Sequence, residues 1–159
     1  MELVLIRHGQ AEERGSRIID DERELTPKGR IRLKKAVVGL KRLLCENSRF
    51  IIISSPLPRA LQTAEILADG LGIENLKKNE CVSDGNLGSL VSGWDKLDEC
   101  DCIILVGHEP HLSYWSELIC GITLPFKKGA AACVTLNTLK PPSGVLRWFA
   151  QPGVLEAIK

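Results

Sequence analysis

Three short apolar runs, each followed at once by glycine or polar residues, divide this chain. They occupy residues 3–6, 50–53 and 102–106 and consist almost entirely of leucine, isoleucine and valine. Runs of four or five such residues, bounded by turn-forming residues, predict buried strands. The first run ends in Arg7-His8-Gly9, and the third ends in Gly107-His108-Glu109-Pro110.

Segments with apolar residues at helical spacing separate these runs. Thr26 is suited to cap a helix that begins at Pro27. Its apolar positions are Ile31, Leu33, Ala36, Val37, Val38, Leu40 and Leu43 or Leu44, with lysine and arginine on the other face. Further helices are predicted over residues 58–71, 87–97 and 112–120. A short strand is expected near Cys81 and Val82.

The last part of the chain changes character. Residues 130–136 and 145–149 are strand-like, and residues 140–144 between them are rich in turn formers, which predicts an antiparallel hairpin. The polar residues 10–24 are expected to form a loop over the site. The order of elements predicts one α/β domain over residues 1–159 with a largely parallel sheet.

The overall composition excludes several classes of function. The chain has 159 residues, of which 44% are hydrophobic and 26% charged, as in an ordinary globular protein. A net charge of +1 gives no electrostatic reason to expect a nucleic acid or a membrane surface as partner. No apolar run approaches the ~20 residues needed to span a bilayer. No secretory signal is visible, so a cytoplasmic location is expected.

Six cysteines are irregularly spaced, which favours buried thiols over disulfides. They are Cys45, Cys81, Cys100, Cys102, Cys120 and Cys133. The close pair at positions 100 and 102 lacks a second pair at zinc-site spacing. We therefore expect no metal and no cofactor.

Chemically versatile side chains follow all three predicted strands. Arg7 and His8 follow the first, Arg59 the second, and His108 with Glu109 the third. In a parallel sheet these strand ends meet at one edge, where ligands bind. Arginine can bind phosphate oxygens in pairs, and an imidazole can attack phosphorus. The combination predicts a phosphoryl-transfer site with His8 as the nucleophile.

The same segments resemble the motifs of the histidine phosphatase superfamily, which includes the phosphoglycerate mutases. The sequence LVLIRHGQAE at residues 3–12 is similar to the first motif, residues 54–64 to the second, and residues 106–110 to the third. Residues 23–29 and 146–152 resemble the small phosphohistidine phosphatases of the SixA type. The resemblance implies a three-layer α/β/α sandwich with a mostly parallel sheet and an antiparallel C-terminal part.

The resemblance also implies roles for individual residues. His8 would be the phosphorylated nucleophile, and Arg7, Arg59 and His108 would hold the phosphate. The proton donor would be Glu109, as in another branch, or Asp84, which lies where many members carry a carboxylate. Two further residues, Gln10 and Ser55, could either donate to a phosphoryl oxygen or only satisfy the local turns. His111 is interpreted as a residue of the surface or of the rim of the pocket.

The small size of the chain favours an open site. Only residues 10–24 and 79–93 are available to cap it, which suits a phosphoryl group displayed on a protein surface. The predicted function is hydrolysis of phosphohistidine on a phosphorelay-type partner protein. The alternatives are a broad small-molecule phosphomonoesterase and a module that binds phosphorylated proteins without turnover. A mutase is disfavoured because it would have to protect its phosphoenzyme from water.

Overall fold

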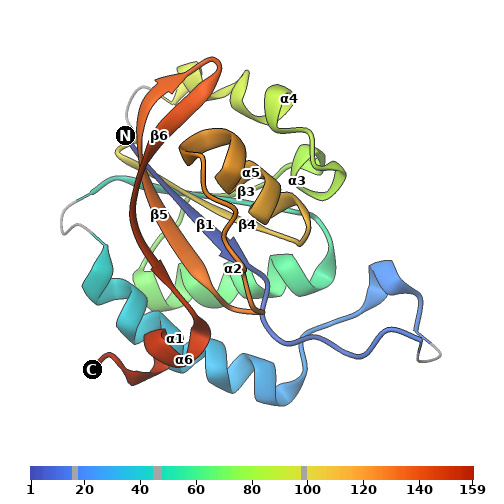
Figure 1. Cartoon of the computed structure of the whole chain (residues 1–159). Helices are drawn as coiled ribbons and strands as arrows, with labels where there is room; N and C mark the ends of the chain where they lie inside the picture. The colour runs from blue at the N-terminus through green and yellow to red at the C-terminus, as the bar shows by residue number, and fades with distance from the viewer. Residues whose placement is uncertain (16–17, 45–47, 98–99) are drawn as a thin grey trace.

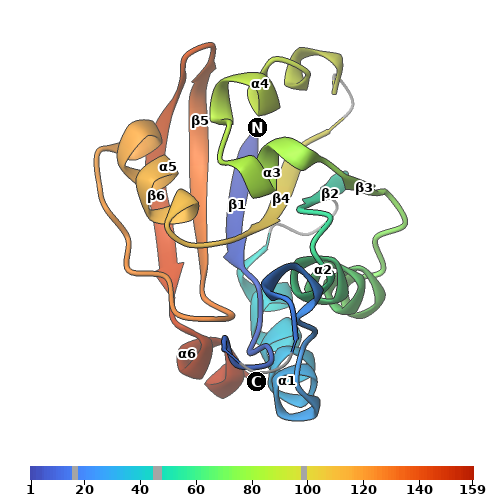
Figure 2. The same ribbon diagram turned by 90° about the vertical axis from the view of Figure 1, so that its right-hand side faces the viewer.

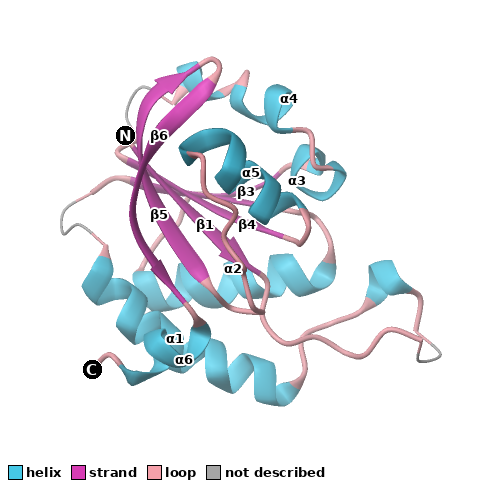
Figure 3. Cartoon of the chain, viewed as in Figure 1, coloured by secondary structure: helices cyan, strands magenta, loops and turns pink. Residues whose placement is uncertain are grey.

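The computed structural model describes residues 1–15, 18–44, 48–97 and 100–159, and its centre is a six-stranded sheet (Figures 1 and 3). The order of the strands in the sheet is β3-β2-β4-β1-β5-β6. Their bounds are β1 Glu2–Arg7, β2 Phe50–Ser54, β3 Leu76–Lys78, β4 Cys102–Gly107, β5 Ala131–Leu139 and β6 Pro142–Ala150.

The described residues form six α-helices and two short 3-10 helices, all of which lie between strands except α6, which follows the last strand. The α-helices are α1 Pro27–Leu43, α2 Pro58–Leu71, α3 Glu80–Asp84, α4 Leu87–Val91, α5 His111–Cys120 and α6 Pro152–Ala157. The 3-10 helices are η1 Asp20–Glu22 and η2 Trp94–Lys96. Thr26 caps α1 as predicted, because its side-chain oxygen accepts a hydrogen bond from the Gly29 amide at 3.0 Å.

The sheet is parallel over four strands and antiparallel at one edge. β1 lies between β4, to which it is parallel, and β5, to which it is antiparallel. β2 pairs in parallel with both β3 and β4, and β5 forms the predicted hairpin with β6. The predicted mostly parallel sheet with an antiparallel C-terminal part is therefore confirmed.

Helices cover both faces of the sheet, which confirms the three-layer α/β/α arrangement (Figure 2). Along β1, Leu3 and Leu5 pack against α3, α4 and α5, whereas Val4 and Ile6 pack against α1, α2 and α6. All four side chains are at most 2% exposed. Successive residues of a strand point to opposite faces, so a strand that is apolar at every position requires a helical layer on each side.

The structure corrects the sequence prediction near Cys81 and Val82. These residues belong to helix α3, and the short strand is β3, a few residues earlier. Asn79 starts the helix, since its side chain accepts a hydrogen bond from the Cys81 amide at 2.9 Å. Gly85 ends it with a positive φ of 75°. A capping asparagine and a left-handed glycine outweighed the weak strand propensity of two residues.

Three further expectations about the helices need correction. The single helix predicted over residues 87–97 is interrupted, because α4 ends at Val91 and η2 follows Gly93. Helix α6 was not predicted. On α1, Ile31 and Val38 are 58% and 53% exposed, so the buried face is narrower than the apolar spacing indicated.

All five described cysteines are buried in part or in full. Cys102 and Cys133 are buried in the sheet, whereas Cys81, Cys100 and Cys120 are partly buried. Cys45 lies outside the described residues. Among the helices of the described ranges, none has the length and apolar character required to cross a membrane.

Candidate active site

The candidate site lies at the edge where β1, β2 and β4 end. The parallel register places Arg7 opposite Gly107, so His8 and His108 are the next residues on neighbouring strands. The His8 amide donates to the Gly107 carbonyl at 3.0 Å, and the two imidazole centroids lie 5.2 Å apart. His8 is 4% exposed and His108 is 7% exposed. The structure thus brings together the two histidines that the sequence placed at strand ends.

The His8 ring is held in one tautomer. Its Nδ1 lies 2.8 Å from the carbonyl oxygen of Gly9, which can only accept, so Nδ1 carries the proton and donates. The other nitrogen, Nε2, then keeps its lone pair. Burial, with added repulsion from His108, Arg59 and Arg7, lowers the pKa of His8 to about 3. At neutral pH the ring is therefore uncharged, the state that a nucleophile needs.

The two arginines of the site are anchored in the same way. Arg7 Nη1 donates to the Phe126 carbonyl at 2.8 Å, and Arg59 Nη1 donates to the Asp20 carbonyl at 2.9 Å. The Nε atom of each arginine is buried without a hydrogen-bond partner. The Nε–Nη2 edge of each guanidinium group carries two parallel N–H groups that match two oxygens of a phosphate, and on Arg59 the Nη2 atom also lies 3.7 Å from the Asp20 carboxylate.

His108 is bound through its second ring nitrogen to the residue that follows β2. His108 Nε2 lies 2.7 Å from Ser55 Oγ, and this oxygen accepts the Leu57 amide at 3.2 Å. Ser55 can donate to Nε2 or accept a second hydrogen bond from it, so a neutral His108 carries its proton on either Nδ1 or Nε2. Burial, followed by the charge of Arg59, lowers the pKa of His108 to about 4.

Unsatisfied polar atoms concentrate at this site. Six buried side-chain nitrogen or oxygen atoms of the described residues lack a hydrogen-bond partner. Four of them belong to Arg7, Arg59, His108 and Glu109. A buried donor without a partner costs free energy, so it usually marks a position that a ligand occupies. The two arginine Nε atoms are N–H donors, which an oxyanion would satisfy.

Thr63 joins the first motif to the second, and the sequence did not single it out. Its hydroxyl accepts the Gly9 amide at 3.0 Å and donates to the Arg59 carbonyl at 2.7 Å. Gly9 also packs tightly on α1, where an added Cβ would lie 2.5 Å from Leu33 Cδ1. The glycine of the Arg-His-Gly sequence is therefore required by close packing. In the sequence, only the position of Thr63, one helical turn after Arg59, could have indicated that it belongs to the site.

The predicted loop at residues 10–24 reaches the site through Asp20. In addition to the carbonyl contact with Arg59, the Asp20 carboxylate lies 2.9 Å from Arg23 Nε, 3.2 Å from Arg14 Nε and 3.7 Å from Arg59 Nη2. Arg23 is only 4% exposed. Partial burial opposes it, but the charges of Arg23, Arg59 and Arg14 lower the pKa of Asp20. Neither Asp20 nor Arg23 was predicted as a site residue.

The two carboxylates considered as proton donors lie in different environments. Glu109 is partly buried, and its charge acts on the Arg7 guanidinium. One Glu109 oxygen lies 2.5 Å from Ser113 Oγ, which is also 2.6 Å from the Leu124 carbonyl. Asp84 is exposed at the end of α3. The role of each in catalysis stays a prediction.

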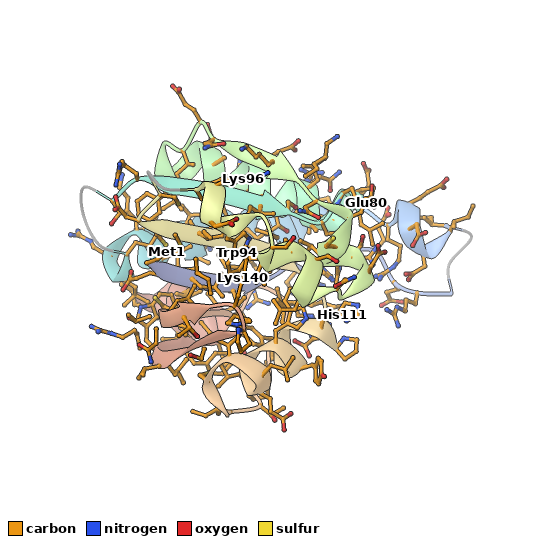
Figure 4. The ribbon with its side chains drawn as sticks, turned by 90° about the horizontal axis from the view of Figure 1, so that it is seen from above. Met1, Glu80, Trp94, Lys96, His111 and Lys140 are labelled. Carbon is orange, nitrogen blue, oxygen red and sulfur yellow. The ribbon has the colours of Figure 1, made fainter. Side chains whose placement is uncertain are left out.

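Two other predicted residues have structural contacts that the sequence did not show. Gln10 holds the start of α1, because its carbonyl accepts hydrogen bonds from the amide and hydroxyl of Thr26. His111, which is labelled in Figure 4, stacks on Trp115 with ring centroids 6.1 Å apart and lies against Gly85 at the end of α3. Within the described ranges, no group of three or more His, Cys, Asp or Glu side chains could hold a metal ion.

Known proteins are similar to this chain in sequence and in fold. The sequence profile of the histidine phosphatase superfamily (branch 1) matches residues 3–101. An uncharacterized protein of Picosynechococcus sp. is 37% identical over 123 residues, which cover 75% of this chain and 73% of that protein.

Solved structures of low sequence identity share the fold. The protein histidine phosphatase SixA, complexed with tungstate, is 24% identical with a TM-score of 0.82, covering 96% of this chain and 98% of its own. A mycobacterial glucosyl-3-phosphoglycerate phosphatase complexed with VO3 is 18% identical with a TM-score of 0.71, covering 94% of this chain and 99% of its own. With its first two motifs inside the matched segment, the chain belongs to branch 1 of the histidine phosphatase superfamily and is a phosphatase.

Proposed function

We propose that this phosphatase hydrolyses phosphohistidine on a partner protein, and that His8 carries the phosphoryl group between two chemical steps. The observation that carries the proposal is the state of His8, whose Nδ1 donates to the Gly9 carbonyl while Nε2 is left unprotonated. The similarity to the protein histidine phosphatase SixA over 96% of the chain supports the choice of substrate.

In the first step, His8 Nε2 attacks phosphorus. A bond forms between Nε2 and phosphorus, and the bond between phosphorus and the partner's imidazole breaks. When the other nitrogen of that imidazole carries a proton, the group leaves as neutral imidazole and needs no further proton. The hydrogen bond to Gly9 holds the attacking ring in place, and the developing positive charge on it is shared with that carbonyl.

In the second step, the oxygen of a water molecule forms a bond to the phosphorus of phosphorylated His8 while the bond between Nε2 and phosphorus breaks. Both protons of the water stay on the product, which leaves as dihydrogen phosphate, and His8 Nε2 regains its lone pair. The Nε–Nη2 edges of Arg7 and Arg59, and the Nδ1 atom of His108 when it carries a proton, are the groups proposed to hold the phosphoryl oxygens in both steps. Donors placed before the reaction stabilise the charge of the transferring group without reorganisation.

Glu109 is the carboxylate that we propose as proton donor for leaving groups poorer than imidazole. The Ser113 hydroxyl has one proton but lies within hydrogen-bond distance of both Glu109 and the Leu124 carbonyl. The second oxygen of Glu109, Oε1, is buried without a hydrogen-bond partner, and Glu109 directly follows His108 in the chain. Asp84, which is exposed on α3, is the alternative donor.

A second candidate function is hydrolysis of small phosphate esters. It is favoured by the shared fold of the mycobacterial glucosyl-3-phosphoglycerate phosphatase. A module that only binds phosphorylated proteins is less well supported, because binding alone would not require an unprotonated nucleophile beside the arginines.

The deciding experiment is a trapping assay with a partner protein labelled with ³²P at histidine. Rapid quenching in alkali preserves phosphohistidine, and label on this chain then reports the intermediate. We expect label on the wild type and on a His111→Asn variant, and none on His8→Asn. Label that persists in His8→Asn would refute the proposed nucleophile.

Substrate class is tested in the same preparations. We expect kcat/KM to be higher for the phosphohistidine protein than for p-nitrophenyl phosphate, and a clear preference for the ester would favour the second function. A Glu109→Gln variant should lose more activity on a poorly leaving alkyl phosphate than on phosphohistidine. If Asp84→Asn shows this selective loss instead, the donor is Asp84.

A further inference from the structure

The outer face of α5 exposes large apolar side chains next to the candidate active site. Tyr114 and Leu118 are 56% and 51% exposed, and Ile122, just after the helix, is 45% exposed. The inner face of the same helix is fully packed, with Leu112 and Trp115 at 0% exposure. The helix thus has an apolar side on the sheet and a second apolar strip facing outward.

The spacing of these residues makes the strip continuous. Positions 114 and 118 are four residues apart, so they are neighbours on one face of a helix. His111, the first residue of α5, lies on the same face, and His108 precedes it by three residues. With a rise of about 1.5 Å per residue, Leu118 is about 10 Å along the axis from His111. The strip therefore begins at the margin of the site and leads away from it.

A further exposed apolar side chain, Ile19, lies in the loop over the site, which contacts Arg59 through Asp20. Ile19 is 66% exposed and immediately precedes Asp20, whose carbonyl accepts the hydrogen bond from Arg59. Of the nine large hydrophobic side chains exposed in the described residues, four are thus on α5, the turn after it, or the loop over the site. A small phosphate ester would leave these side chains in water.

A phosphohistidine on a folded protein reaches His8 only if that protein touches the margin of the site. His8 is 4% exposed, and a histidine side chain is short, so the partner's backbone must approach the residues around the opening. We propose that the α5 strip, Tyr114 and Leu118 with Ile122, is the docking surface for the partner protein that carries the phosphohistidine. The partner surface it fits has apolar side chains beside its phosphorylated histidine. This inference rests on the proposed function.

The test compares a protein substrate with a small one in a Tyr114→Ser/Leu118→Ser double variant. The protein substrate is a histidine-containing phosphotransfer protein phosphorylated with phosphoramidate, and the small substrate is phosphoramidate itself. We expect kcat/KM for the protein to fall at least tenfold, equivalent to about 1.4 kcal/mol, with the loss mainly in KM. Activity on phosphoramidate should stay within twofold of the wild type, which also shows that the variant is folded.

An Ile31→Ser/Val38→Ser variant is the matched control, since these α1 residues are similarly exposed but lie on another helix. It should leave both activities unchanged. Equal loss on both substrates in the α5 variant, or no loss on either, would overturn the docking surface. So would a wild-type dimer that the α5 variant converts to monomer, because the strip would then bind a second copy. A wild type that cleaves phosphoramidate but no phosphohistidine protein would instead refute the proposed function.

Discussion

The two buried histidines should make the fold sensitive to acid in a range where most proteins are still stable. The pKa of His8 falls from 6.5 to about 3 on folding, and that of His108 falls from 6.5 to about 4. The unfolded chain therefore binds protons at a pH where the folded chain does not. Stability is fully present above pH 6.5 and decreases as the pH falls toward the folded values.

The size of the effect follows from these values. Between pH 7 and pH 5 each histidine is expected to remove about 2 kcal/mol of unfolding free energy, or about 4 kcal/mol together. This is a large share of the roughly 5–15 kcal/mol that stabilises a typical domain. Solvent screens these two rings little, because both are more than nine-tenths buried.

The assay is urea unfolding at pH 7 and pH 5, followed by circular dichroism. We expect His8→Asn and His108→Asn each to reduce the acid-induced loss by about 2 kcal/mol, and the double variant to remove most of it. Each substitution also changes the free energy of unfolding at pH 7, so the quantity compared is the difference in that free energy between the two pH values. Equal acid-induced losses in the wild type and the double variant would refute the reasoning.

Two substitutions test the packing and the anion contacts of the site. In Gly9→Ala the new Cβ would lie 2.5 Å from Leu33 Cδ1, so thermal unfolding should show a loss of about 1–3 kcal/mol, and a loss below about 0.5 kcal/mol would contradict the close packing. Arg59→Lys cannot present two parallel N–H groups, so the Ki of inorganic phosphate should rise about tenfold or more. An unchanged Ki in Arg59→Lys would exclude the Nε–Nη2 edge as a phosphate contact.

The strands and their ends could be predicted because the sheet is covered on both sides. A strand such as β4, buried at every position, is visible as an uninterrupted apolar run. Parallel strands end at one edge, so the convergence of Arg7, His8, Arg59 and His108 followed from the order of elements. The site residues that were missed depend on loop paths. Nothing in the polar residues 10–24 indicated that Asp20 turns back to Arg59.

Short helices were also missed by the sequence prediction. Helix α6 has six residues, too few to show a period, and it is held by packing on α1 rather than by its own sequence pattern. An added Cβ at Gly39 of α1 would lie 2.1 Å from the Leu155 carbonyl, so the contact depends on a glycine 116 positions earlier. Such a pairing becomes visible only in three dimensions.

The position of β1 in the middle of the sheet has a consequence for synthesis. The Arg7 amide donates to the Ala130 carbonyl, and the His8 amide donates to the Gly107 carbonyl. The strand that leads to His8 therefore stays unpaired until partners 99 and 123 residues later in the chain have been translated. At roughly 5–20 residues per second, these intervals last from about 5 to 25 s. Until then a chain still on the ribosome has an incomplete site and an apolar strand with both edges unpaired, which makes β1 the segment most in need of protection by chaperones.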